Sequence, residues 1–283
     1  MSAKWRFKAI RTWYWKPGTD YCTAIVKSLG SRVEDGDVIV VSEKAISTAR
    51  GNLVDESKVA PGGAASFIAG FWMRRVWGYF LGPLCHLKVR TIEHLRRYPL
   101  LEGAQHKQVV LRIAGLLSAL KYGSEGGIDV SNLPLRYACL PLHEPSREAD
   151  RIRSSIGDKL GRRVTVMIAD TDSTFSIRSF HFTSRPYPIS SIKSFGGFVT
   201  YVVGKSLRLR ERATPLAVSG SRLSTEDVLN LSELAHHARG SGAGRTIWDA
   251  ATMFGVEPSE VTWRMLESVD HFPLVLFRLR RDQ

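Results

Sequence analysis

Two short apolar runs constrain the fold of this chain more than any other feature. Asp37–Val41 reads DVIVV and Val164–Ala169 reads VTVMIA, and the turn-like sequence VEDG precedes the first of them. Short runs rich in β-branched and other apolar residues, bounded by turn residues, are typical of buried strands. We therefore expect these two segments to form strands inside a sheet.

Helices are predicted between and after these strands. His106–Tyr122 has apolar residues at helical spacing, and Arg147–Leu160 is a second helical segment that ends at Gly161. Ser224 begins a third helix with a capping-box pattern.

The remaining segments add strands in no regular order. We predict a polar turn at Asp170–Phe175, a strand at Phe198–Val203 and a terminal strand at Leu274–Leu279. Because helices and strands do not follow one another in a regular β-α-β order, the predicted fold class is α+β, with mixed sheets and packed helices. We expect residues 1–283 to form one unit, or two intimately packed subdomains without a clear linker.

The charge favours anionic partners. Lys and Arg number 40 against 27 Asp and Glu, which gives a net charge of +13. Such a surplus suits nucleotide phosphates, phosphorylated small molecules, nucleic acid or an acidic membrane surface. A dedicated nucleic-acid reader would need an aromatic-rich strand motif, a zinc knuckle or a recognition helix, and the sequence has none of these. A nucleic-acid partner is therefore disfavoured.

Cysteine usage and the first residues indicate the cytoplasm. Cys22, Cys85 and Cys139 are odd in number, lie far apart and lack metal-binding spacing. They fit a reducing compartment, where they act as small buried apolar residues. Met1–Tyr14 contains no continuous apolar stretch of the kind that a secretory signal requires.

One aromatic segment, Ser66–Leu87, needs comparison with a membrane span. Arg74 and Arg75 stand at its centre and Pro83 interrupts it, whereas a spanning helix needs about 20 mostly apolar residues. We predict an amphipathic helix that packs on the domain or on a subunit partner, in a homodimer. An interfacial helix on a membrane surface is the alternative.

Two aspartates are candidate metal ligands. Asp129 lies in the glycine-rich stretch GGIDVSN, and Asp170 directly follows the predicted strand VTVMIA, with Thr171 next to it. Carboxylates and hydroxyls are the ligands that hard divalent cations prefer, and nucleotide phosphates can complete the coordination shell. An aspartate after a strand is also common in ordinary turns, so the pattern alone leaves both interpretations open.

A glycine-rich loop near the C-terminus is a candidate phosphate site. The sequence RGSGAGR offers Arg239, Gly242, Gly244 and Arg245, and a helix is predicted to follow. Exposed backbone amides and flanking arginines can bind phosphate there. The loop matches neither the Walker lysine motif nor a dinucleotide fingerprint, so a flexible connection between helices is the alternative.

Four motifs in order resemble a known family. EDGDVIVVSEKAIS (Glu34–Ser47), GGIDVSN (Gly126–Asn132), a Leu-Pro segment at Leu140–Pro141 and VTVMIADT (Val164–Thr171) follow one another at similar spacing. Together they resemble the coenzyme F420-0:L-glutamate ligase family. The similarity extends over most of the chain, and the ordered set is more specific than any single motif.

The resemblance implies an activity and a set of site residues. Family enzymes use GTP and a divalent metal, Mg or Mn, to activate a carboxylate as an acyl phosphate, which the amine of L-glutamate then attacks. The acceptor is a phosphorylated small molecule, coenzyme F420-0, and the fold forms an intertwined dimer. By position, the metal ligands would be Asp129, Asp170 and Thr171, and the residues near the nucleotide would be Glu43, Lys44 and Asn132.

Departures from the family pattern suggest a divergent archaeal branch. Thr48 replaces a family lysine, and Asp172–Thr174 replaces a Gly-Arg turn after the second aspartate. These changes leave two further readings open. One is a paralogous amide ligase with another acceptor or nucleotide, and the other is a non-catalytic protein that binds phosphate or nucleic acid on the same fold.

Overall fold

A computed structural model describes residues 5–123, 125–134, 137–244, 247–257 and 260–280. Within these residues the main body is a seven-stranded mixed sheet in the order β1-β9-β2-β5-β6-β7, with β8 paired to β5 outside this path. Its strands are β1 (Trp5–Thr12), β2 (Val38–Ser42), β5 (Thr165–Ile177), β6 (Phe180–Thr183), β7 (Lys193–Ser194), β8 (Arg210–Ser219) and β9 (His271–Leu279). A small sheet pairs β3 (Leu53–Asp55) with β4 (Tyr137–Cys139). The predicted α+β class is confirmed.

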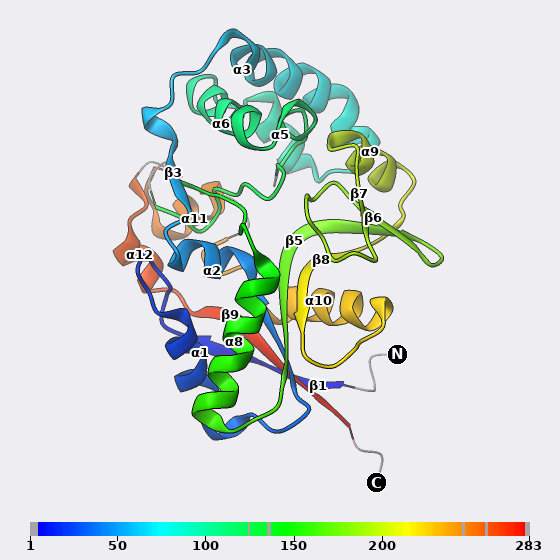
Figure 1. Cartoon of the computed structure of the whole chain (residues 1–283). Helices are drawn as coiled ribbons and strands as arrows, with labels where there is room; N and C mark the ends of the chain where they lie inside the picture. The colour runs from blue at the N-terminus through cyan, green and yellow to red at the C-terminus, as the bar shows by residue number, and fades with distance from the viewer. Residues whose placement is uncertain (1–4, 124, 135–136, 245–246, 258–259, 281–283) are drawn as a thin grey trace.

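The central strand β2 is buried on both faces. Ile39 and Val41 belong to a core cluster that includes residues of α1 (Tyr21–Leu29) and α8 (Pro145–Leu160). Val38 and Val40 belong to a second cluster, which they share with α10 (Thr225–Arg239). Because successive side chains of a strand point to opposite faces, helices must cover both sides of the sheet, as Figure 1 shows. This explains the unbroken apolar run in the sequence.

β2 runs parallel to the first part of β5, and this pairing ends at the carboxyl end of β2. Ser42, the last residue of β2, pairs with Ala169 of β5, so both chains leave this register at the same edge. The predicted turn at Asp170–Phe175 is wrong, because β5 continues to Ile177. The second half of β5 pairs with β8 on one side and with β6 on the other, which supplies the hydrogen bonds that keep it extended.

Seven helical segments form what we call the helical cap, at the end of the molecule away from both termini (Figure 1). They are α3 (Gly63–Phe67), η4 (Ile68–Leu81), α4 (Gly82–Leu84), α5 (Val89–Arg96), α6 (Leu101–Ile113), α7 (Leu116–Ala119) and α9 (Phe198–Ser206). The turns of η4 are of the wider π type, and its Met73 and Trp77 are fully buried in the core of the cap. The segment Ser66–Leu87 thus packs in part on the rest of the chain, which is one of the two predicted alternatives, and a role in a homodimer interface stays a prediction.

Two local predictions in the cap differ from the structure. Phe198–Val203, predicted as a strand, is the helix α9, whose Tyr201 packs its ring against Trp77 at a centroid distance of 6.0 Å. The helix predicted at His106–Tyr122 begins earlier, at Leu101, and breaks at Gly115, whose φ of 78° ends α6 before α7.

The remaining helices are α2 (Glu43–Ala49), α11 (Ile247–Phe254) and α12 (Trp263–Glu267), with single 3₁₀ turns at Gly30–Arg32 and Glu56–Lys58. The cap predicted for α10 is confirmed, since the Ser224 hydroxyl accepts a hydrogen bond from the amide of Asp227. All three cysteines are free and buried. Among the described residues, no helix has the length and apolarity that crossing a membrane requires.

Candidate active site

A cavity of about 510 Å³ opens where the parallel pairing of β2 with β5 ends, between the helical cap and the end of α10. Eight of the residues predicted for the site lie on its wall: Lys44, Asp129, Asn132, Asp170, Thr171, Arg239, Gly242 and Gly244. Glu43 is not among the lining residues; it is buried beside the cavity. Arg245 lies outside the described residues. Segments far apart in the sequence therefore meet at one place.

Asp129 is held in a fixed orientation at the cavity wall. One carboxylate oxygen accepts a hydrogen bond from the Ser131 amide at 2.7 Å, and the other accepts one from the Ser131 hydroxyl at 3.0 Å. The Nζ of Lys44 lies 2.9 Å from the same second oxygen and also donates to Ser131. Because Lys44 follows Glu43 at the start of α2, this ion pair joins the glycine-rich stretch to the end of β2.

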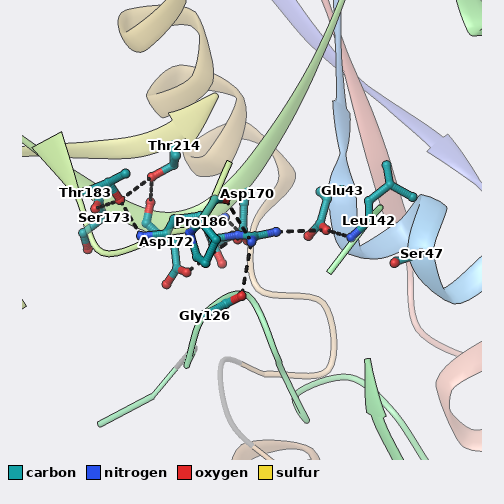
Figure 2. Close-up of polar contacts among 12 residues, drawn as sticks. Glu43, Ser47, Gly126, Leu142, Asp170, Asp172, Ser173, Thr183, Pro186 and Thr214 are labelled. Carbon is teal, nitrogen blue, oxygen red and sulfur yellow. Dashed lines mark hydrogen bonds and ion pairs between the residues drawn. The ribbon is translucent and has the colours of Figure 1, made fainter. Parts of the chain in front are cut away.

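Asp170 is paired with an arginine that the sequence did not indicate. The Nε of Arg185 lies 2.7 Å from one oxygen of Asp170, and the other oxygen accepts a hydrogen bond from the amide of Thr171 at 2.6 Å. The same guanidinium reaches Glu43 at 3.1 Å and the carbonyl of Gly126 at 3.2 Å. Figure 2 shows Glu43 on one side of this group and Asp170 on the other.

The environment of Glu43 opposes its ionisation. Its side chain is 3% exposed, and burial together with nearby Asp170 raises its pKa to about 7, while Arg185 and a hydrogen bond from the Leu142 amide act in the opposite direction. Glu43 therefore positions Arg185 and the backbone at Leu142, because it bonds both groups. Its side chain does not line the cavity.

Gly127 is required by the approach of Arg185. A Cβ at this position would lie 2.3 Å from the guanidinium carbon, and φ is 88°. Only glycine allows both the backbone conformation and this contact. The buried arginine thus explains the second glycine of the GGID motif, whereas a Cβ at Gly126 would lie 2.6 Å from the Cβ of Ala114. The glycine pair is a sequence signal that could have indicated close approach of other groups.

Lys121 is a further cation on the cavity wall. The Nζ of Lys121 is 3.0 Å from a carboxylate oxygen of Asp172, two residues beyond Asp170 on β5, and both residues line the cavity. The ring of Tyr201 lies 5.2 Å from the same Nζ. The cavity wall thus carries acidic and basic side chains close together, which suits a ligand that carries several charges.

Asn132 fixes the glycine-rich loop that follows α10. Its side-chain amide donates to the carbonyl of Gly244 at 2.8 Å, and its carbonyl oxygen accepts from the amide of Ala243 at 2.8 Å. A Cβ at Gly242 would lie 3.1 Å from the same oxygen. Asn132 therefore holds the loop against the cavity, in addition to lining it.

The side chains on the cavity wall fit a metal ion that takes some of its ligands from phosphate and water. Among the described residues there is no cluster of three or more His, Cys, Asp or Glu side chains that could hold a metal. Asp129 and Asp170 provide two carboxylates on one cavity, and Thr171 provides an exposed hydroxyl beside them. Mg²⁺ commonly binds through one or two carboxylates with water and substrate phosphates. The site therefore fits a metal that enters with phosphate, and it does not form a closed protein cage.

Comparisons with known proteins agree with this arrangement of motifs. The family model for F420-0:Gamma-glutamyl ligase matches residues 9–227. An uncharacterized protein of Methanocaldococcus jannaschii is 34% identical over 96% of both chains. Coenzyme F420:L-glutamate ligase of the same organism is 25% identical over 73% of this chain and 70% of its own length, and that of Archaeoglobus fulgidus is 29% identical over 56% and 55%. The chain belongs to the F420-0:gamma-glutamyl ligase family, a family of ligase enzymes.

Proposed function

We propose that this enzyme uses GTP and Mg²⁺ or Mn²⁺ to form a γ-glutamyl-type amide on a phosphorylated acceptor such as coenzyme F420-0. The observation that carries the proposal is the meeting of Asp129 and Asp170 on one cavity, although they lie in different motifs. Membership of the ligase family supplies the reaction class. The three free, buried cysteines support a reducing, cytoplasmic location.

The residues would divide the work according to their positions. Asp129, Asp170 and Thr171 would hold the metal, which when bound supplies positive charge that screens the phosphates. Lys44 would orient Asp129, and Arg185 holds Asp170 in one rotamer through a buried hydrogen bond. Preorganised charges of this kind act without reorganising when the reaction occurs.

The proposed chemistry has two steps. A carboxylate oxygen of the acceptor attacks the γ-phosphorus of GTP, the bond to the β,γ-bridging oxygen breaks, and GDP leaves. The amine of L-glutamate then attacks the acyl carbon, inorganic phosphate leaves with the C–O bonding electrons, and the amine loses a proton. The cavity's role is to bring the three reactants together and to limit water, which would hydrolyse the acyl phosphate.

Incubation of the purified protein with F420-0, L-glutamate, GTP and Mn²⁺ tests this proposal. Mass spectrometry should detect the acceptor with one added glutamyl residue, and Asp129→Asn should lower the rate by about 100-fold or more. Asp270→Asn is the matched control, because Asp270 also lines the cavity but pairs with Arg11 at the exposed rim. A wild-type protein that forms no amide, or an unaffected Asp129→Asn variant, would contradict the proposal.

A paralogous ligase with another acceptor or nucleotide is the second candidate. Thr48, which stands where the family pattern has a lysine, lines the cavity, so the change reaches the ligand. The same assay with ATP in place of GTP, and with other carboxylate acceptors, separates the two candidates. Product with ATP or a different acceptor alone would favour the paralogue, whereas phosphate binding without any product would indicate a non-catalytic protein.

A further inference from the structure

Arg239, the last residue of α10, lines the cavity with an unpaired guanidinium. Both of its terminal nitrogens are buried, and neither has a hydrogen-bond partner among the described residues. The other buried arginines differ. Arg185 donates to Asp170 and Glu43, and the terminal nitrogens of Arg212 donate to Glu226 and Asn230.

A buried charge without a partner destabilises a fold. Loss of hydration around the Arg239 guanidinium lowers its pKa to about 10, and the charge of Asp170 offsets this only in part. Asp170 makes no hydrogen bond to the terminal nitrogens of Arg239; its oxygens accept from the Thr171 amide and from Arg185. Among the described residues, no acceptor is therefore present for the two buried terminal nitrogens of this cavity-lining arginine.

The loop beside Arg239 does not offer an open cradle of amides. The amides of Gly240 and Gly244 donate to the carbonyls of His237 and Ser241, and the Ala243 amide donates to Asn132. A Cβ at Gly244 would lie 2.3 Å from the Cβ of Asp249, so close packing accounts for that glycine. Three amides of the loop are thus already hydrogen-bonded, and Arg239 adds a side-chain donor for an anion at this end of the cavity.

We propose that Arg239 binds a phosphoryl group of the ligand through its two terminal nitrogens and that this contact completes its charge pairing. A guanidinium presents parallel N–H bonds that match two oxygens of one phosphate. The proposal rests on the proposed function in one respect, namely that the ligand of this cavity is phosphorylated. The phosphoryl group belongs to the nucleotide or to the acceptor, and the experiment below separates these sources.

The apo protein gives the first readout. Arg239→Met removes an unpaired buried charge but keeps an unbranched side chain, so the melting temperature should stay the same or rise. Arg212→Met is the matched control, because it removes a buried arginine that is paired, and it should lower the melting temperature by several degrees. An Arg239→Met variant that melts as early as Arg212→Met would overturn the proposal.

Ligand binding gives the second readout, and it does not depend on turnover. Calorimetry with pyrophosphate, GTP, ATP and F420-0 should show at least a tenfold loss of affinity in Arg239→Met, about 1.4 kcal/mol, with Arg239→Lys intermediate. Loss for pyrophosphate and both nucleotides assigns the contact to the nucleotide, and loss for F420-0 alone assigns it to the acceptor. Unchanged affinity for all four ligands overturns the proposal, even if the amide ligase activity is confirmed.

Discussion

Glu43 and Asp170 are neighbours in space because each directly follows the last paired residues of the parallel register between β2 and β5, and a single buried guanidinium joins them. Ser42 pairs with Ala169 in a parallel register, so Glu43 at the start of α2 lies beside Asp170, where β5 continues. Arg185 then bonds both carboxylates, at 3.1 Å to Glu43 and 2.7 Å to Asp170. Two acids that would otherwise repel each other in a buried place are thus held together at the edge of the cavity.

The first prediction concerns this arginine. Arg185→Met leaves Glu43 and Asp170 buried without a cation, so the free energy of unfolding measured with urea should fall by about 3–5 kcal/mol. Without Arg185 the pKa of Glu43 rises further, so Glu43 must take up a proton; adding Glu43→Gln supplies a side chain that is already neutral and should recover part of the loss.

Arg147→Met is the control for this measurement. Arg147 pairs with Glu144 on the surface, with both side chains more than half exposed, so its loss should cost about 1 kcal/mol or less. A double variant no more stable than Arg185→Met alone would show that Glu43 and Arg185 are not coupled.

The second prediction concerns the glycine against which Arg185 lies. In Gly127→Ala the new methyl group meets the guanidinium 2.3 Å away, and the arginine cannot retreat without releasing Asp170 and Glu43. Gly123→Ala is the matched control: φ is also positive, at 64°, but nothing lies within 4 Å.

Thermal unfolding distinguishes the two glycines. The control should lose only the backbone preference of glycine, roughly 1–2 kcal/mol, whereas Gly127→Ala should lose at least about 2 kcal/mol more. Equal losses for the two variants would mean that the guanidinium moves aside at little cost.

The sequence predicted the strands that position the site better than it predicted the contacts among the side chains of the site. β2 and the start of β5 were evident as apolar runs, and the polar residues after them, such as Asp170, were reasonable site candidates for that reason. Arg185 could not be predicted, because it reaches Asp170 only after β5 and β6 have formed a hairpin, and nothing local marks its charge as buried. Long-range packing, and not local pattern, determines such contacts.

Tertiary contacts also outweighed local secondary-structure propensity in two segments, one predicted as a turn and one predicted as a strand. Residues from Asp170 to Phe175 are polar enough for a turn, yet pairing with β8 and β6 extends them as a strand. Phe198–Val203 has aromatic and β-branched residues typical of a strand, yet it folds as α9 because a helix buries Tyr201 against Trp77 and Phe175. In each case tertiary contacts outweigh an intrinsic preference of about 1 kcal/mol.

The third prediction concerns assembly. One face of η4 and its flanks carries exposed apolar side chains that we call the aromatic stripe: Phe67, Phe71, Tyr79, Phe80 and Leu84. Phe80 is 70% exposed. Large contiguous apolar surfaces usually mark an interface, so we expect the chain to form a homodimer through this stripe.

Light scattering at micromolar concentration tests the homodimer. Phe80→Glu should shift the dimer toward monomer without changing the circular dichroism spectrum. Phe7→Glu is the control, because Phe7 is also exposed, at 46%, but lies on β1 in the main sheet. A wild-type monomer, or a dimer that both variants leave intact, would contradict an interface at the stripe.

The fourth prediction concerns pH and a charge network inside the helical cap. His106 lies 2.6 Å from Glu56 and also bonds Glu125, which in turn accepts from Lys107 at 2.6 Å. Burial opposes protonation of His106, but the two carboxylates outweigh it and raise its pKa to about 10. Burial likewise opposes ionisation of Glu125, but Lys107 and His106 lower its pKa to about 2.

These shifts define a window of stability. A histidine with a raised pKa stabilises the fold fully below its ordinary value of about 6.5, and this contribution is lost as pH rises toward 10. Glu125, with a lowered pKa, contributes above about 4.5 and loses its contribution as pH falls toward 2. The network should therefore stabilise the fold most between pH 4.5 and 6.5.

The variant His106→Gln tests this window. The difference in free energy of unfolding between wild type and His106→Gln should shrink by on the order of 2 kcal/mol or more from pH 6 to pH 9.5. His237→Gln, which alters a 64%-exposed side chain on α10, should differ little from wild type at either pH. A His106→Gln difference that stays constant across this range would show that His106 is neutral in the folded protein, and the proposed ion pairs with Glu56 and Glu125 would then be wrong.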